Sequence, residues 1–241
     1  MTESTSRGKF ITFEGIDGCG KTTQAEKLLE LLEKKELSVS FIREPGGDPI
    51  SESIRKLLLH AEESMSDRAE ALLMVASRAQ LTDKVILPHL LNGRWVIGDR
   101  YADSTLAYQG GGRGLSATAL ENMNNFGTYT LKPDLTFFID ISVEEANERM
   151  SISRDRIERE GTEFQQRVRD FYLNLQQKEP ERVMLIDGHK SIDDIHEQVC
   201  SFSFNCQDGS RGTVISYPTC WLAHSLSASP RPSCCPNACV P

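Results

Sequence analysis

The sequence predicts an α/β fold in which a five-stranded parallel sheet is flanked by helices. Two observations support this fold. Short runs of β-branched and aromatic residues alternate with helical patterns over the first 200 residues, as expected when crossover helices connect parallel strands. A glycine-rich loop stands between the first such run and the first helical pattern, a position that suits phosphate binding. The expected strands are residues 10–13, 39–42, 95–97, 135–141 and 183–186.

The helices are predicted from apolar periodicity. After Lys21, the stretch from Ala25 to Leu32 places apolar side chains at i, i+3, i+4 and i+7, opposite a charged face. Ser66 is suited to cap a second, long helix over residues 67–91. Further helices are expected over residues 51–59, 118–125, 143–150, 164–177 and 192–199.

The composition of the 241 residues is that of a globular protein, with 39% hydrophobic and 26% charged residues. The formal net charge of −8 argues against broad binding to nucleic acid, so any anion site must be local. No apolar run approaches the roughly 20 residues that span a bilayer, and the N-terminus lacks the apolar segment of a secretory signal. We therefore expect a cytoplasmic protein without a nucleic-acid or membrane partner.

The composition changes near the end of the chain. Six of the seven cysteines follow residue 199, and residues 202–241 hold half of the ten prolines and no lysine. The cysteines form no C-x2-C pair, so they do not predict a zinc site. We expect an N-terminal extension over 1–8, one domain over 9–201 and a disordered tail over 202–241, with a frame change at the gene end as the alternative origin of the tail.

Residues 15–22 read Gly-Ile-Asp-Gly-Cys-Gly-Lys-Thr and match the pattern G-x4-G-K-[ST]. Glycines let successive backbone N–H groups turn toward a phosphate, and the helix N-terminus adds its positive dipole end. Lys21 is expected to reach the outer phosphates, and Thr22 to ligate Mg²⁺. Cys19 is expected to fill space and not to act as a nucleophile. The expected ATP-binding residues are Gly15, Ile16, Asp17, Gly18, Cys19, Gly20, Lys21, Thr22 and Thr23.

Charged residues are expected at the carboxyl edge of the sheet, where open α/β sheets bind ligands. Arg43 directly follows the second strand, and Asp99 and Arg100 follow the third. An acid at this point can hold Mg²⁺ through water while the arginine beside it faces a phosphate. The sequence therefore predicts Asp99, together with Thr22, as a metal-binding residue.

A phosphate loop alone does not define a reaction. The Asn-Lys-x-Asp motif of GTPases is absent, and so is the signature of ABC-type ATPases. The arginines and the Gln-Gly-Gly-Gly-Arg-Gly run at 109–114 are expected at the ends of successive strands, which favours two anionic ligands that face each other. Met74 and Arg78, four residues apart on a predicted helix, share a face and are suited to line one side of that pocket.

Several short motifs follow one another in a fixed order. They are Phe13-Glu14-Gly15, the phosphate loop, Arg43-Glu44-Pro45-Gly46-Gly47, Ser77-Arg78, Gly98-Asp99-Arg100-Tyr101, Tyr108-Gln109-Gly110-Gly111-Gly112-Arg113-Gly114 and Lys132-Pro133-Asp134-Leu135. As an ordered set they closely resemble bacterial thymidylate kinases, from about residue 9 to residue 202. The resemblance implies the three-layer fold of P-loop NTPases with a short lid. It also implies a homodimer that transfers the γ-phosphoryl group of ATP to dTMP, giving dTDP and ADP for dTTP synthesis.

The resemblance implies roles for single side chains in dTMP binding. Asp17 would accept the 3′-hydroxyl of the deoxyribose, while Arg43 and Arg100 would hold the phosphate. Arg78 would read the thymine edge, and Tyr108 would lie over the sugar and exclude a 2′-hydroxyl. Further candidates for contacts with the base are Ser104, Thr105 and Gln109.

One position departs from the family pattern. Met74 stands where the family usually carries a Phe that stacks on thymine, so the apolar contact remains but aromatic stacking is lost. Base selectivity is therefore less constrained than the reaction type. Two alternatives stay open: a related kinase for another nucleoside monophosphate or a deoxynucleoside, and an inactive nucleotide-binding module.

The charged segment within residues 151–161 corresponds to the lid of the family. Gly18 occupies the third variable position of the phosphate loop, so the loop brings no arginine. The resemblance then implies that Arg154, Arg156 or Arg159 supplies the catalytic charge, with the first two preferred. Catalysis is expected to depend on alignment and on stabilisation of an anionic transition state. The expected catalytic residues are Lys21, Asp99, Arg154 and Arg156.

Overall fold

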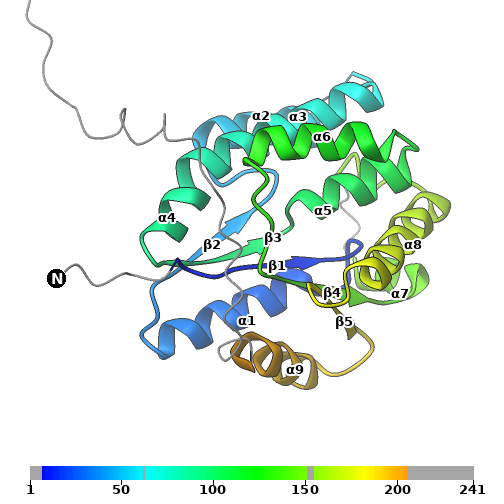
Figure 1. Ribbon diagram of the computed structural model, residues 1–241. Helices are drawn as coiled ribbons and strands as arrows, with labels where there is room; N and C mark the ends of the chain where they lie inside the picture. The colour runs from blue at the N-terminus through cyan, green and yellow to red at the C-terminus, as the bar shows by residue number, and fades with distance from the viewer. Residues whose placement is uncertain (1–6, 62, 151–154, 206–241) are drawn as a thin grey trace, which may run out of the picture. The chain divides into compact units, whose positions relative to one another are not determined.

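The structure is a computed structural model that describes residues 7–61, 63–150 and 155–205. Within these residues, five strands form one sheet in the order β2-β3-β1-β4-β5, and every neighbouring pair is parallel. The predicted α/β fold with a five-stranded parallel sheet is confirmed (Figure 1). The strands are β1 Phe10–Glu14, β2 Val39–Arg43, β3 Trp95–Asp99, β4 Leu135–Asp140 and β5 Val183–Asp187.

Helices connect the strands, and side-chain caps fix where α2, α3, α6 and α7 begin. Asp48 accepts a hydrogen bond from the Ile50 N–H (2.9 Å), and Ser66 accepts one from the Ala69 N–H (3.3 Å). The helices are α1 Lys21–Lys34, α2 Pro49–His60, α3 Asp67–Leu81, α4 Leu87–Leu91, α5 Ala102–Thr105, α6 Ala117–Thr128, α7 Val143–Arg149, α8 Thr162–Lys178 and α9 Ile192–Asn205, with π-helical segments η1 Thr82–Ile86 and η2 Leu106–Gly112.

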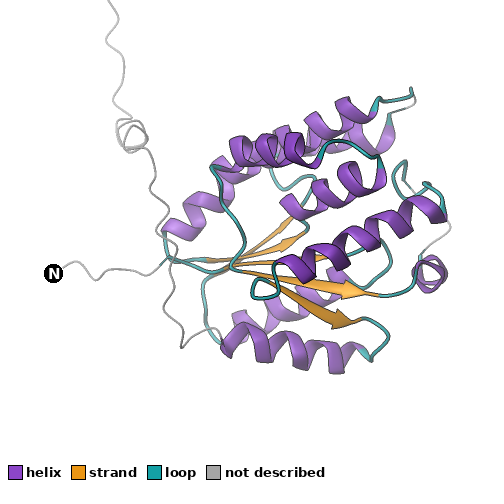
Figure 2. Ribbon diagram, turned by 45° about the vertical axis from the view of Figure 1, so that its right-hand side comes forward, coloured by secondary structure: helices purple, strands orange, loops and turns teal. Residues whose placement is uncertain are grey.

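The sheet lies between two layers of helices. Helices α1 and α9 cover one face, and α2, α3, α5 and α6 lie over the other (Figures 1 and 2). All residues of β1 are buried, as expected for a central parallel strand that is covered on both faces. The rings of Phe13 and Phe137 lie 5.1 Å apart within this core. Because all strands are parallel, the loops that follow β1, β2 and β3 leave from the same edge of the sheet.

The long helix predicted over residues 67–91 is interrupted. Helix α3 ends at Leu81, and the chain reaches α4 through η1, where the Leu87 N–H donates to the Thr82 carbonyl five residues earlier. Pro88 gives a physical reason, since its nitrogen has no hydrogen to donate to the preceding turn. The wider π-helical turn shifts the hydrogen-bond register at that point.

The segment that follows β3 is helical, which the sequence did not predict. The run at 109–114 was expected at a strand end, and this expectation is wrong because residues 109–112 belong to η2. Helix α8 packs on η2 so closely that a Cβ atom at Gly112 would overlap the ring of Phe164. Glycine is therefore required here for close approach of two helices.

The predicted domain boundaries differ slightly from the described structure. Helix α9 continues through Asn205, and the ring of Phe202 lies 6.4 Å from that of Phe137, so the folded part extends past residue 201. Residues 206–241, most of the predicted tail, lie outside the described residues, as do residues 1–6 of the predicted extension. At the other end, Arg7 pairs with Asp134 (2.9 Å).

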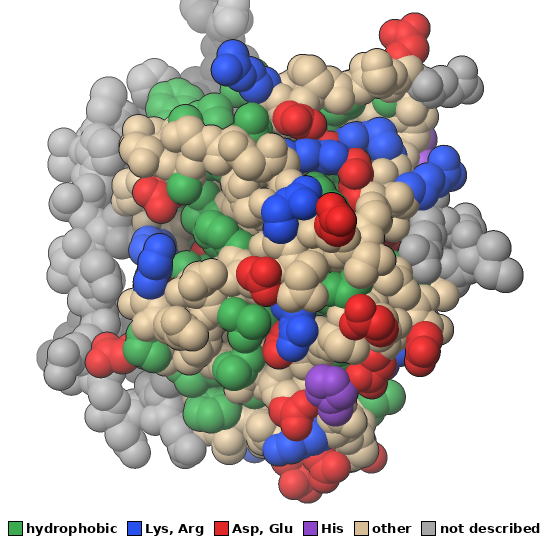
Figure 3. Space-filling model, turned by 90° about the vertical axis from the view of Figure 1, so that its right-hand side faces the viewer, with side chains coloured by type: hydrophobic (Ala, Val, Ile, Leu, Met, Phe, Trp, Pro, Cys, Tyr) green, Lys and Arg blue, Asp and Glu red, His purple; other side chains and the backbone are tan. Residues whose placement is uncertain are grey.

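The surface carries charges of both signs. Figure 3 shows Lys and Arg side chains interspersed with Asp and Glu on the face that carries α7 and α8. This mixture limits the long-range electric field, so anion binding depends on local geometry. Among the described residues, none of the helices has both the length and the apolar character that a membrane span needs.

Candidate active site

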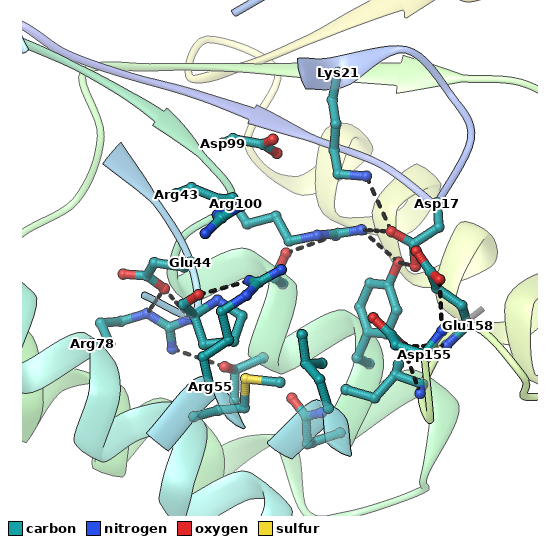
Figure 4. Close-up of a pocket in the computed structure, with 18 of the residues that line it drawn as sticks. Asp17, Lys21, Arg43, Glu44, Arg55, Arg78, Asp99, Arg100, Asp155 and Glu158 are labelled. Atoms are coloured by element: carbon teal, nitrogen blue, oxygen red, sulfur yellow. Dashed lines mark hydrogen bonds and ion pairs between the residues drawn. The ribbon is translucent and has the colours of Figure 1, made fainter. Parts of the chain in front are cut away.

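A cavity of about 310 Å³ opens at the carboxyl edge of β1, β2 and β3 (Figure 4). Its volume falls in the range of small-ligand sites. It brings together residues that the sequence predicted separately, from the phosphate loop, the strand ends, α3 and η2. The lining residues are Asp17, Lys21, Thr22, Arg43, Glu44, Pro45, Arg55, Leu59, Met74, Arg78, Asp99, Arg100, Ser104, Thr105, Tyr108, Gln109, Asp155, Ile157 and Glu158.

The phosphate loop connects β1 to the N-terminus of α1. Gly18 has φ +84°, and a Cβ atom there would overlap the Ala146 carbonyl of α7, so the loop needs glycine at this position. The Lys21 ammonium donates to an Asp17 oxygen (3.2 Å) and points into the cavity (Figure 4). Cys19 is buried, and burial raises the pKa of its thiol, as expected for a residue that fills space. Thr23 is exposed on α1 and does not line the cavity.

Thr22 and Asp99 form the part of the site that is suited to a metal ion. The Thr22 hydroxyl donates to Asp99 Oδ2 (2.6 Å), whereas Asp99 Oδ1 is buried and has no hydrogen-bond partner among the described residues. A buried carboxylate oxygen without a partner is costly unless a ligand binds it. Within the described residues no cluster of three His, Cys, Asp or Glu side chains is gathered for a metal. The arrangement fits Mg²⁺, which takes one or two protein oxygens and completes its shell with water and phosphate.

Arg100 donates hydrogen bonds from both of its terminal nitrogens to groups around the cavity. Its Nη1 donates to the Gly15 carbonyl and to Ser104 Oγ (both 3.1 Å). Its Nη2 donates to Asp17 and to the Tyr108 hydroxyl (2.9 Å). The sequence separated these residues by up to 93 positions, and the parallel strands bring them to one edge.

Asp17 is held in its ionised form by its neighbours. Burial opposes ionisation, but Arg100 and Lys21 overcome this effect and hold the pKa of the carboxyl group below its usual range. The Tyr108 hydroxyl adds a hydrogen bond of 3.0 Å. A charged Asp17 suits the predicted role of accepting a hydrogen bond from a sugar hydroxyl.

Arg78 lies at the inner end of the cavity and is almost fully buried, with 2% of its surface exposed. All of its guanidinium nitrogens bond to protein groups, as Figure 4 shows in part. Its partners are Glu44 (Nε, 2.8 Å), Thr105 and Asn124 (Nη1, 2.8 Å each) and the Tyr101 carbonyl (Nη2, 2.9 Å). The Arg78 side chain therefore has a fixed position. A nucleotide base that bonded to its guanidinium would do so alongside these protein partners.

One of the four arginines that line the cavity, Arg55, was missed by sequence reasoning. Arg55 of α2 lines the cavity, donates to the Pro45 carbonyl (2.8 Å), and has a pKa lowered by burial and by the charge of Arg43. Arg43 itself is half exposed and lies 3.5 Å from Glu52. The available signal was that Arg55 lies four residues after the buried Ser51 and so shares the inner face of α2.

The described part of the predicted lid segment, residues 155–161, presents acidic side chains to the cavity. Asp155 and Glu158 line it, and Asp155 Oδ1 accepts hydrogen bonds from the backbone N–H groups of Ile157 (2.8 Å) and Glu158 (2.9 Å). Sequence reasoning considered only the arginines of this segment and did not assign these acids. Arg154, a predicted catalytic residue, lies outside the described residues.

Arg156, the other predicted lid arginine, is bound away from Lys21. Its Nη2 donates to Glu70 (2.6 Å) and its Nε to the Leu58 carbonyl (2.9 Å). Glu70 is 1% exposed and also accepts hydrogen bonds from Gln109 (2.9 Å) and Arg113 (3.0 Å). Although burial opposes ionisation, these donors lower the pKa of Glu70. In this conformation Arg156 anchors the lid to α2 and α3.

Comparison with known proteins gives the family. The family model described as thymidylate kinase matches residues 13–199. A thymidylate kinase of Kosmotoga olearia is 47% identical over 192 residues, covering 79% of this chain and 92% of that protein. One of Nitrosospira multiformis is 45% identical over 195 residues, covering 80% of this chain and 95% of that protein.

A solved structure agrees in fold. The crystal structure of thymidylate kinase from Ehrlichia chaffeensis is similar with a TM-score of 0.69 and 35% sequence identity, and the match covers 82% of this chain and 98% of that one. Sequence and fold therefore agree over the part that holds the phosphate loop, the arginines at the strand ends and the cavity. The chain belongs to the thymidylate kinase family and is a nucleoside monophosphate kinase.

Proposed function

We propose that the enzyme transfers the γ-phosphoryl group of ATP to the 5′-phosphate of dTMP, forming ADP and dTDP. One observation carries this proposal. Lys21 of the phosphate loop lines the same cavity as Arg43 and Arg100, which stand at the ends of β2 and β3. Cations for a donor and for an acceptor phosphate thus face one space, as transfer between two nucleotides requires.

The chemistry needs alignment more than acid–base groups. An acceptor phosphate oxygen attacks the γ-phosphorus while the bond to the β–γ bridging oxygen breaks, and ADP leaves with that electron pair. The attacking oxygen is already ionised near neutral pH, so no protein base is needed. Lys21 supplies positive charge where the transferred group develops negative charge. Lys21, Thr22 and Asp99 are all present on the proposed donor side. Their presence favours a kinase over an inactive nucleotide-binding module.

A panel of phosphate acceptors tests the proposal directly. With ATP and Mg²⁺ present, we expect kcat/KM for dTMP to exceed the values for dUMP, dCMP, dGMP and thymidine. A higher value for any other acceptor would replace dTMP in the proposal and would favour the related kinase that the sequence left open. Absence of transfer to every acceptor would favour the binding module.

Met74 is expected to limit the affinity for the base. It lines the cavity on α3, where a Phe would add aromatic stacking worth about 0.5–1.5 kcal/mol. We expect Met74→Phe to lower the KM for dTMP about two- to tenfold, with the KM for ATP as the internal control. An equal change in both constants, or a higher dTMP KM, would contradict contact between residue 74 and the base.

Thr22 and Asp99 are proposed to hold Mg²⁺, which neutralises phosphate charge when bound. The unpartnered Asp99 Oδ1 supports this assignment. We expect Asp99→Asn, which keeps the size and can still accept from Thr22, to raise the Mg²⁺ concentration for half-maximal rate about tenfold or more. Asp193→Asn, at an exposed carboxylate on α9, serves as the control. An unchanged Mg²⁺ requirement would exclude Asp99 as a metal ligand.

The catalytic role of the lid arginines stays a prediction. For Arg156 to contact a phosphate, its guanidinium must leave Glu70 and the Leu58 carbonyl when the lid closes. A phosphate is suited to replace a carboxylate as the partner of an arginine, since both accept paired N–H groups. Arg154 is the alternative source of this charge.

A homodimer is proposed from exposed apolar side chains on two packed helices. Phe126 of α6 is 87% exposed and Leu72 of α3 is 56% exposed, and the two helices contact each other. A contiguous patch of exposed apolar side chains marks a contact surface, and we propose that these two helices carry one. We expect Phe126→Asp to yield monomers in analytical ultracentrifugation at concentrations where the parent chain is dimeric. Leu91→Asp, at a similarly exposed leucine of α4, is the control. A dimeric Phe126→Asp variant would place the interface elsewhere.

The cytoplasmic location stays a prediction from sequence.

A further inference from the structure

Glu14 is a fully buried carboxylate that does not line the cavity. It is the last residue of β1 and accepts three hydrogen bonds. Oε1 accepts from the Tyr101 backbone N–H (2.7 Å), and Oε2 accepts from the hydroxyls of Ser104 (2.6 Å) and Tyr172 (2.7 Å). These donors belong to three different parts of the fold: the turn after β3, α5 and α8. Glu14 therefore connects the end of β1 to all three.

Two of these hydrogen bonds fix Arg100. This residue has φ +75°, in the left-handed region that residues other than glycine seldom adopt, so its backbone must be fixed by its surroundings. The bond from Glu14 to the next backbone N–H, that of Tyr101, holds this turn. Ser104, which donates to Glu14, also accepts a hydrogen bond from Arg100 Nη1. Glu14 thus constrains both the backbone and the guanidinium of Arg100 without touching the cavity.

The third hydrogen bond comes from the helix that follows the lid. Tyr172 lies on α8, which begins at Thr162, and its ring stacks on Phe138 at 5.1 Å. Its hydroxyl reaches Glu14 across 158 positions of the sequence. A displacement of α8 would therefore act on the same carboxylate that positions Arg100.

The charge of Glu14 is balanced by the groups around it. Burial raises its pKa to about 7, and the nearby Asp103 adds to this effect. Arg100 and the hydroxyls of Ser104 and Tyr172 favour the ionised form. As an ionised carboxylate it accepts from all three donors, whereas a protonated Oε2 would face two hydroxyl groups with a hydrogen of its own. A neutral side chain of the same size should therefore disturb the arrangement.

We propose that Glu14 is a positioning residue that sets the Arg100 guanidinium for the acceptor phosphate, and that Tyr172 makes this placement depend on the helix that follows the lid. The inference rests on the proposed function, in which Arg100 binds the acceptor phosphate. It concerns positioning alone, since neither Glu14 nor Tyr172 lines the cavity.

The test compares Glu14→Gln and Tyr172→Phe in the full chain. We expect Glu14→Gln to raise the KM for dTMP about tenfold, because a small misplacement of a binding group has a large kinetic effect. Tyr172→Phe should raise it by a smaller factor, and the KM for ATP should change less than about twofold in both variants. If Tyr172 acts through Glu14, the double variant should be no worse than Glu14→Gln.

Thr12→Val is the matched control. Thr12 precedes Glu14 by two residues on β1, points to the same face of the sheet, and makes one buried hydrogen bond to Thr136 (2.9 Å). The Thr12→Val variant loses a buried hydroxyl close to Glu14. It should therefore lower thermal stability without changing the KM for dTMP. Should Glu14→Gln fail to fold, the comparison of Tyr172→Phe with Thr12→Val decides the question.

The Arg100→Lys variant distinguishes a failure of the positioning role of Glu14 from a failure of the proposed function. If it raises the KM for dTMP while Glu14→Gln and Tyr172→Phe do not, the positioning role is overturned and the proposed function stands. If none of the three variants changes this KM, the role of Arg100 fails and the inference fails with it. Equal increases in the KM values for dTMP and ATP, or additive effects in the double variant, would also overturn the inference.

Discussion

Lys21→Ala is expected to lower kcat by about 10²- to 10³-fold and to leave the fold intact. The Lys21 ammonium lines the cavity at the phosphate loop, where we propose that it compensates charge on the transferred group. Among the described residues, the ammonium makes two long hydrogen bonds, to Asp17 (3.2 Å) and to the Ile16 carbonyl (3.5 Å). Asp17 keeps its contacts with Arg100 and Tyr108 in the variant, so no buried charge is left without a partner.

The measurement combines a coupled assay of ADP release with thermal unfolding. Lys27→Ala is the matched control, since Lys27 lies on the same helix and pairs with the exposed Asp193 at 3.0 Å. An exposed ion pair of this kind contributes little, so this variant should keep normal kcat. Near-normal turnover of Lys21→Ala would contradict the assignment of the phosphate loop.

Arg78→Met is expected to lower the free energy of unfolding by about 3–5 kcal/mol. Arg78 and Glu44 form a buried ion pair with 2% and 4% of their side chains exposed. Removal of the guanidinium leaves the Glu44 carboxylate buried without a compensating charge, and the Thr105, Asn124 and Tyr101 oxygens lose their donor. Breaking one side of such a pair costs more than the pair itself contributes.

The loss should depend on pH. Burial raises the pKa of Glu44 in the parent chain, and Arg78 opposes this effect. In Arg78→Met the folded-state pKa is higher still, so the variant retains stability at low pH and loses it as pH rises through that pKa. Urea unfolding should therefore show a larger difference from the parent at pH 8 than at pH 5. Adding Glu44→Gln should restore part of the stability at pH 8. Equal losses at both pH values would contradict this account.

The fold was predictable because its signals are local. Each strand is a short apolar run, and the phosphate loop is one contiguous motif between a strand and a helix. The π-helical segment Leu106–Gly112 was missed because it ends in three glycines, which have low helix propensity. Its helical form depends on packing against Phe164 and Phe171 of α8, more than 50 residues away in the sequence. Tertiary contacts of this kind leave no periodic pattern.

The residues of the site were predictable from the sequence, but their hydrogen-bond partners were not. The strand-end rule and the family resemblance brought Asp17, Arg43 and Arg100 to one cavity, and the structure places them there. Their roles stay predictions. What sequence reasoning could not supply were partners that the fold selects, such as Glu70 for Arg156 and Glu14 for Tyr101. These pairs lie 86 and 87 positions apart and follow from the tertiary arrangement.

The strand order affects how the acceptor preference of the enzyme can evolve. Strand β1 lies at the centre of the sheet, with β3 and then β2 on one side and β4 and then β5 on the other. The chain therefore switches from one side of β1 to the other between β3 and β4. Such a switch opens a crevice at the strand ends through the topology alone. The position of the proposed donor half therefore follows from topology, whereas the proposed acceptor half combines Arg43 and Arg100 at the strand ends with side chains of α2, α3 and η2. Evolution of a new acceptor preference can proceed in those three segments while the ATP half stays the same.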